Sequence, residues 1–395
     1  MDLSYGPHYE AFRRQVREFL ERHGDEAPRG AGLRSEAALA WQRQLIEHGY
    51  AARTIPREYG GYGAAPDILE SRIIAEEFAR AQVSQGLGGQ GISMLVPTLL
   101  EMGTEEQKRE FIGPTLRGEL VWCQGYSEPG AGSDLASLTT SAVAEKDHWV
   151  VNGQKIWTST AQLADWMFCL VRTEPDAPKH QGISFLLLRM DTPGIEVRPL
   201  VDMTGAANFN EVFFTDVRVP LHQIVGERGQ GWQVANAILG HERDSLGNPD
   251  ATLARLNALM DLMRRETIDG VPLMEHAAYR DRLMKLQGRV MAMRCNDLRI
   301  LSARVNGGNA TLARMIVKLQ GTELRHDLEG LAVDVMGELG LAYGDNPYLR
   351  DNGTWQTQYM YFLGLIIGGG TSQIQKNIIS ERGLGMPREP KVQRG

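Results

Sequence analysis

The sequence predicts a mostly helical α+β protein in which a small antiparallel β domain separates two helical regions. Three changes of pattern along the 395 residues support this division. Apolar residues recur at helical spacing up to about residue 120, and short β-branched and aromatic runs alternate with turns from about 121 to 228. Long helical stripes follow from 229 to 395. A chain of this length exceeds the usual size of one core, so we expect three domains, 1–120, 121–228 and 229–395.

The first region contains apolar residues at the spacing of amphipathic helices. The clearest positions are Phe12, Val16, Phe19, Leu20, Ala38, Trp41 and Leu45. The segment Tyr59-Gly60-Gly61-Tyr62-Gly63 carries the glycines of a turn. We therefore expect an N-terminal helical domain with short breaks.

The middle region has the composition of β-strands. Strand-like runs occupy 148–151, 166–172, 183–188, 195–199 and 211–217. The dipeptide Asn152-Gly153 follows the first run and is a strong signal for a β-hairpin turn. This pattern predicts a small antiparallel barrel or sandwich.

The last region returns to long helical stripes. Their apolar positions include Leu253, Leu256, Leu259, Met260, Met263, Leu283, Leu286, Val290, Val317, Leu324 and Leu328. Long helices with short breaks favour an antiparallel bundle.

Composition limits the possible functions. The net charge is −7 without a block of like charges, which argues against a general nucleic-acid surface. No apolar run is long enough to span a membrane, and the first twenty residues lack the apolar segment of a secretion signal. The cysteines Cys123, Cys169 and Cys295 have no metal-ligand spacing, so we expect buried free thiols, no metal site and a cytoplasmic protein.

Three segments carry residues suited to a ligand. The run Gly368-Gly369-Gly370-Thr371 lets the backbone approach a ligand closely, and Thr371 is a plausible N-cap for a helix containing Ile374 and Ile378. The run from Tyr126 to Asp134 is a glycine-rich turn with hydroxyl groups, although a plain surface turn fits it equally well. In the third, Trp157 precedes the hydroxyl of Ser159. This indole could stack on a flat cofactor or be an ordinary core residue.

Taken together, and with the run from Phe209 to Pro220 between them, these segments resemble the acyl-CoA dehydrogenases. The resemblance extends from about Phe12 to Pro387. It implies an N-terminal helical domain, a middle β-barrel domain and a C-terminal four-helix bundle. It also implies FAD as cofactor, an acyl-CoA thioester as substrate and electron-transfer flavoprotein as the electron acceptor. Such proteins are usually homotetramers, and a heterotetramer is the alternative.

The resemblance also implies roles for individual residues. In the first turn, the residues that would line the flavin and CoA are Tyr126, Ser127 and Ser133. The residues beside the isoalloxazine ring would be Trp157 and Ser159. Thr371 and Gln373 would meet the nucleotide half of FAD at a helix N-terminus.

The family reaction needs a carboxylate that removes a proton from Cα of the thioester. Many members place this glutamate in the closing turn, where the present chain has Gly369. The other family position is an early helix of the bundle, and there Glu242 falls on the apolar stripe. A structural ion pair with an arginine or histidine is the alternative for Glu242. The resemblance makes Glu242 the base, Gly369 a backbone donor to the thioester oxygen, and Arg243 a neighbour of the acyl-CoA channel.

Two departures from the family pattern concern the FAD site. The segment from His276 to Arg280 lacks the arginine and the Phe-Gly pair that bind pyrophosphate in many relatives, and Glu338 replaces a family glycine. Arg280 or Arg282 could substitute. The alternatives are a subunit of a heteromeric dehydrogenase, a flavin oxidase or monooxygenase on the same fold, and a non-catalytic flavoprotein.

Overall fold

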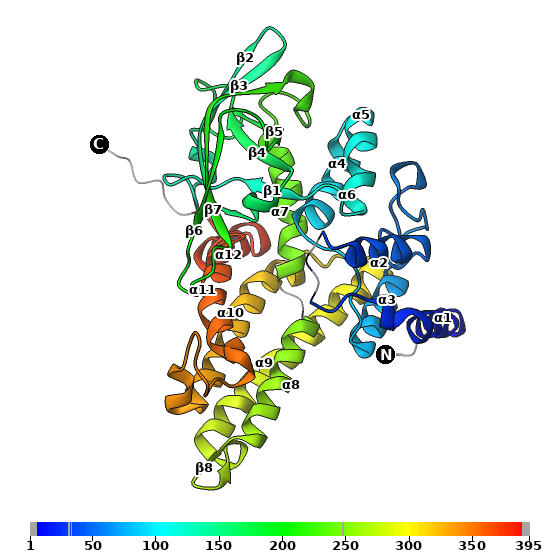
Figure 1. Cartoon of the computed structure of the whole chain (residues 1–395), viewed down its shortest axis with the longest axis vertical. Helices are drawn as coiled ribbons and strands as arrows, with labels where there is room; N and C mark the ends of the chain where they lie inside the picture. Colours follow the sequence, from blue (N-terminus) through cyan, green and yellow to red (C-terminus); the bar gives the residue numbers. More distant parts are fainter. Residues whose placement is uncertain (1–5, 31, 33, 247–248, 389–395) are drawn as a thin grey trace. The chain divides into compact units, whose positions relative to one another are not determined.

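The computed structural model describes residues 6–30, 32, 34–246 and 249–388, and in 241–246 it describes the backbone alone. The chain forms two compact units, Met1–Leu200 with Ala207–Ile238, and Val201–Ala206 with Leu239–Gly395 (Figure 1). Helices come first, a curled sheet follows and helices end the chain, which confirms the predicted fold class. The three predicted domain boundaries remain a prediction.

The first three helices of the first unit pack around one aromatic core. They are α1 (Pro7–His23), α2 (Glu36–Glu47) and α3 (Ile68–Ala81), and α4 (Val96–Met102), α5 (Glu105–Gln107) and α6 (Gly113–Leu116) follow. Ser35 caps α2 by accepting a hydrogen bond from the Ala38 amide, and Asp67 caps α3 in the same way. Phe19 of α1 stacks on Trp41 of α2, which fixes the predicted apolar faces against each other.

The seven-stranded sheet follows these helices in the same unit. Its strands are β1 (Trp122–Gly125), β2 (Ser141–Glu145), β3 (His148–Ser159), β4 (Trp166–Arg172), β5 (Ile183–Arg189), β6 (Ile195–Leu200) and β7 (Phe209–Pro220). The order is β1-β4-β2-β3-β7-β6, with β5 paired to β4. Most pairs are antiparallel as predicted, but β1 and β2 each run parallel to β4. The long strands β3 and β7 carry the alternating burial expected of a sheet with one covered face.

The prediction of a hairpin turn at Asn152-Gly153 is wrong. Strand β3 continues through this dipeptide, and the pairing register with β7 shifts there instead. Asn152 exchanges two hydrogen bonds with Asp216 of β7, and Gly153 has φ of +142°. A Cβ at Gly153 would lie 2.7 Å from Thr140, so this glycine serves a β-bulge and a close approach of two strands.

Helix α7 (Gly231–Leu246) begins in the first unit and ends in the second. The second unit then contains α8 (Pro249–Arg265), a small hairpin of β8 (Thr267–Ile268) and β9 (Val271–Pro272), α9 (Ala277–Val305), α10 (Thr311–Val335), α11 (Thr354–Ile367) and α12 (Ser372–Ile378). Helices α8, α9, α10 and α11 pack side by side as the predicted four-helix bundle (Figure 1). Leu256, Leu283, Leu328 and Trp355 lie in its core.

The three cysteines do not share one environment. Cys123 and Cys169 are buried in the sheet, and burial raises the pKa of both thiols, that of Cys169 to about 11. Cys295 is exposed on α9, so the prediction of a buried thiol is wrong there. Among the described residues, no helix is long and apolar enough to cross a membrane, and no cluster of three His, Cys, Asp or Glu side chains could hold a metal ion.

Candidate functional site

The first predicted ligand segment is a closed turn that leaves the end of β1. The backbones of Glu128 and Ala131 exchange two hydrogen bonds of 3.0 Å, which closes the turn. Tyr126 is buried before it, with its ring edge-on to Phe168. Ser127 is half-buried. The turn is therefore a defined structure and not a loose surface loop.

A buried ion pair anchors this turn to β3. Lys155 is fully buried and donates hydrogen bonds to Glu128, at 2.8 Å, and to the Tyr126 carbonyl, at 3.2 Å. The Glu128 carboxylate also accepts hydrogen bonds from the amides of Thr139 and Thr140. Burial alone would raise the pKa of Glu128, but the charge and hydrogen bonds of Lys155, with the threonine hydrogen bonds, hold it at about 2. Sequence reasoning missed this pair because neither residue lies in an unusual pattern.

The second segment is a bulge near the end of β3. Trp157 has φ of +60° and is 58% exposed, and the register with β7 shifts between Lys155 and Thr158. Positive φ is strained for an aromatic residue, and such strain gathers at functional sites. Trp157 is thus not the core residue that the alternative interpretation required.

Two hydroxyl groups follow the exposed indole. Ser159 is half-buried, and Thr158 is buried with an Oγ1 that has no hydrogen-bond partner among the described residues. A buried hydroxyl normally finds a partner, so this one is suited to a ligand atom. Sequence reasoning overlooked Thr158 because its burial depends on the bulge.

The structure brings these two segments together. The Ile156 amide donates a hydrogen bond of 2.9 Å to the Ser127 carbonyl, which joins the turn to the bulged strand. This hydrogen bond brings Ser127 close to Trp157, which follows Ile156 in the chain. Ser133, two residues after Ala131, is exposed.

The third segment lies in the second unit, where α11 ends. Gly369 and Gly370 have φ of +66° and +97°, which favours glycine at both positions. The Gly369 carbonyl accepts from Gln375 at 2.8 Å, and the Gly370 carbonyl accepts from Lys318 at 2.7 Å. In contrast, the amides of Gly369 and Gly370 donate to no residue that the structure describes.

The helix after this turn has the predicted start. Thr371 accepts a hydrogen bond of 3.2 Å from the Ile374 amide, which confirms it as the N-cap of α12. The Ser372 hydroxyl donates to Glu323 of α10 at 2.8 Å, and Gln373 is exposed in the first turn. The turn and the helix N-terminus together present amides that suit an electron-rich ligand.

Glu242 and Arg243 lie in α7, but their side chains fall outside the described residues. On the same helix Ala235 and Ile238 are fully buried. Glu242 follows Ile238 by four residues, the spacing of one helix face.

The structure also shows the surroundings of the residues at which the chain departs from the family's FAD-binding pattern. Arg282 forms an ion pair of 2.6 Å with Asp334. Arg280 is exposed and makes no side-chain hydrogen bond or ion pair within the described part of the chain. Of the two arginines considered as substitutes, Arg280 is thus the one whose guanidinium is open to a ligand. Glu338 is exposed.

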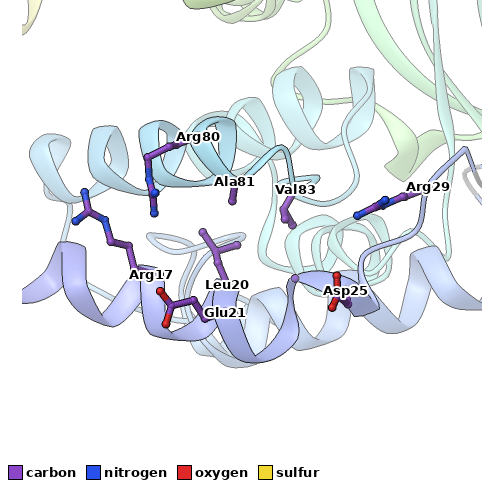
Figure 2. A pocket seen from close by; sticks show the side chains of 9 residues that line it. Arg17, Leu20, Glu21, Asp25, Arg29, Arg80, Ala81 and Val83 are labelled. Atoms are coloured by element: carbon purple, nitrogen blue, oxygen red, sulfur yellow. The ribbon is translucent and has the colours of Figure 1, made fainter.

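A small cavity lies elsewhere, between α1 and α3. The cavity has a volume of about 180 Å³. Figure 2 shows the side chains that line it. Arg17 and Arg80 line it and form ion pairs with the buried Glu77. None of the predicted site residues contributes to this cavity, so it does not bear on the predicted chemistry.

Each of the two units offers groups that suit part of a ligand. In the first unit, an exposed indole and a buried hydroxyl without a hydrogen-bond partner among the described residues suit a flat polar ring. In the second unit, glycine amides before a helix N-terminus suit an anion. The order of helical, sheet and bundle regions, together with these turns, is the one that the resemblance to the acyl-CoA dehydrogenases predicts.

Comparison with known proteins identifies the family. Family models for the N-terminal, middle and C-terminal domains of acyl-CoA dehydrogenase match residues 6–119, 123–217 and 229–384. The acyl-CoA dehydrogenase IpdE1 of Mycobacterium tuberculosis is 39% identical over 97% of this chain and 99% of its own length. This chain belongs to the acyl-CoA dehydrogenase family and is an oxidoreductase, and members of this family are FAD-dependent flavoproteins.

Solved structures agree with this assignment. The Tcur3481-Tcur3483 steroid ACAD aligns with a TM-score of 0.80 at 29% identity, covering 98% of this chain and all of its own. The ChsE4-ChsE5 complex from Mycobacterium tuberculosis aligns with a TM-score of 0.80 at 30% identity and the same coverage. The predicted acyl-CoA dehydrogenase fold is confirmed.

Proposed function

We propose that this protein catalyses the FAD-dependent α,β-dehydrogenation of an acyl-CoA thioester. The observation that carries the proposal is the glycine turn of residues 368–371. Its carbonyls at Gly369 and Gly370 are held by protein side chains, whereas the two amides are left for a ligand. Amides fixed in this way stabilise negative charge that develops on a carbonyl oxygen.

In the proposed reaction Glu242 removes a proton from Cα of the thioester, and the charge that develops on the thioester oxygen is held by the Gly369 amide. FAD, when bound, would supply the hydride acceptor that formation of the Cα–Cβ double bond requires. Shielding from water would raise the pKa of such a carboxylate base toward neutrality, as this step requires.

The remaining residues have binding roles. The flavin ring is assigned to Tyr126, Ser127, Trp157 and Ser159. The nucleotide half of FAD is assigned to Thr371 and Gln373. The CoA thioester is assigned to Ser133 and Arg243. The exposed Trp157 and the Thr158 hydroxyl, which has no hydrogen-bond partner in the described part of the chain, support the ring assignment. We propose electron-transfer flavoprotein as the acceptor of the electrons.

We propose a bulky, ring-bearing acyl group as the substrate. A Cβ at Gly368 would meet a single described neighbour, the Gly364 carbonyl oxygen at 3.4 Å, so there is room beside this glycine. The steroid ACAD among the structural relatives supports the same class. A larger side chain at Gly368 would fill this space.

The second candidate is a subunit of a heteromeric dehydrogenase instead of a homotetramer. Glu338 in place of a family glycine and the likeness to the ChsE4-ChsE5 complex favour it. The FAD content of the purified protein separates the candidates. One FAD per chain supports the homotetramer, and substoichiometric FAD that rises on co-expression with a homologous subunit supports the heteromer.

The proposal is tested with a panel of acyl-CoA thioesters, including ring-bearing ones, mixed anaerobically with the flavin-loaded protein. Bleaching of the flavin absorbance is expected with at least one thioester. The Glu242→Gln variant should slow this bleaching at least about a hundredfold, as expected for loss of a general base. Asp345→Asn, which alters an exposed carboxylate, serves as the control. If the flavin of Glu242→Gln is bleached at nearly the wild-type rate, Glu242 is not the general base. Rapid flavin reoxidation by oxygen would indicate an oxidase.

A further inference from the structure

We propose that Lys318 is a positioning residue, which holds the glycine turn of residues 368–371 so that the Gly369 amide faces the thioester oxygen. The inference rests on the proposed dehydrogenase function and assigns a role to a residue outside every family motif considered above. Lys318 lies on α10, in the same unit as the turn.

The contacts of Lys318 bracket the turn. Its Nζ donates to the Ile366 carbonyl at 3.0 Å and to the Gly370 carbonyl at 2.7 Å. The first carbonyl belongs to the last turn of α11 and the second to the glycine turn itself. One ammonium therefore holds the chain three residues before and one residue after Gly369. A cation at this place also complements the C-terminal end of the α11 dipole.

A second side chain holds the middle of the turn. Gln375 of α12 is 2% exposed and donates to the Gly369 carbonyl at 2.8 Å. A Cβ at Gly370 would lie 2.8 Å from Gln375 Nε2, so a larger residue there would displace this donor. Lys318 and Gln375 together engage the carbonyls of the turn from the protein side. The amide of Gly369 is thereby left as the group that a ligand can use.

The burial of Lys318 argues for more than ordinary packing. The residue is 1% exposed, and a buried ammonium costs more free energy than a neutral donor making the same hydrogen bonds. A positive charge next to the proposed donor also favours the negative charge that develops on the thioester oxygen. Lys318 is thus expected to set both the geometry and the electrostatic potential at Gly369.

Glu329 on the same helix provides a contrast. It is fully buried, but its ion pairs with Arg255 and Arg325 join α8 and α10 and do not reach the glycine turn. A change at Glu329 should lower stability while leaving the turn as it is. Glu329→Gln is therefore the control for a purely structural effect of a buried charge.

The test uses the flavin-loaded protein and a β-aryl-acryloyl-CoA as probe. This thioester is already unsaturated and cannot be dehydrogenated, and its absorption band moves to longer wavelength when its carbonyl oxygen accepts strong hydrogen bonds. In the wild type a red shift is expected on binding. Lys318→Met should lose most of this shift and lower kcat about tenfold or more, with a smaller change in KM. Lys376→Met, an exposed lysine of α12, should behave as wild type.

Gln375→Leu gives an independent reading if Lys318→Met does not fold, and it should also lose part of the red shift. Glu329→Gln should reduce the thermal midpoint and keep the shift. A folded Lys318→Met or Gln375→Leu protein with the full wild-type shift would overturn this inference but not the proposed function. A wild-type protein that neither shifts the probe nor is bleached by any thioester would overturn the proposed function and the inference with it.

Discussion

Replacement of Lys155 by methionine tests the buried ion pair that anchors the turn at Ser127 to the bulged strand. Methionine keeps most of the side-chain volume and removes the charge. Glu128 is 6% exposed and would keep its threonine donors but lose its cation. Removing one partner of a buried pair leaves an uncompensated charge and is strongly destabilising.

The magnitude follows from the pKa of Glu128. Its value of about 2 lies below the ordinary 4.5, so the folded protein favours the carboxylate by about 3 kcal/mol at pH 7. Because the folded pKa is lowered, this stabilisation is fully present above about pH 4.5 and is lost as the pH falls toward 2. Lys155→Met should therefore cost about 3 kcal/mol at pH 7 and about 1 kcal/mol less than that at pH 3.5.

The assay is urea unfolding of both proteins at pH 7 and at pH 3.5, followed by tryptophan fluorescence. Lys146→Met, an exposed lysine in the turn before β3, is the control and should change the free energy of unfolding very little. A loss of stability in Lys155→Met that is the same at both pH values would refute the electrostatic reasoning, because a packing defect does not titrate.

Two further changes test other parts of the first unit. Glu77→Gln removes a buried charge that forms ion pairs with Arg13, Arg17 and Arg80, and should destabilise by about 3 kcal/mol at pH 7. The pKa of Glu77 is about 2, so the measured difference should shrink as the pH falls below about 4.5, and a pH-independent difference would count against it. Gly153→Ala should destabilise by about 1–3 kcal/mol in denaturant unfolding because of the positive φ and the contact with Thr140, and wild-type stability would contradict this.

The elements that the sequence predicted correctly are those with local causes. The N-cap at Thr371 depends on a hydroxyl three residues before an amide, and the stripes at Leu256 and Leu283 depend on helical spacing. The dipeptide Asn152-Gly153 has an equally strong local signal, yet it forms a bulge. Pairing with Asp216, 64 residues away, outweighs the preference for a turn.

In the candidate site, too, the sequence revealed the features with local causes and missed those set by distant contacts. The sequence identified Trp157 and Ser159, but the strained bulge that exposes Trp157 arises from pairing with β7. Thr158, Lys155 and Lys318 were not found because each is ordinary in its own segment. Their burial and their partners depend on contacts between residues far apart in the chain.

The sequence by itself determined the helical and β regions, the family and the glycine turn that has no catalytic carboxylate. Periodicity, caps and motifs act over a few residues, and a single chain displays them directly. Tertiary structure alone decided that the carbonyls at Gly369 and Gly370 are held by Gln375 and Lys318. A hydrogen bond from α10 to a turn about fifty residues away produces no periodic pattern in the sequence, because it depends on how the helices pack.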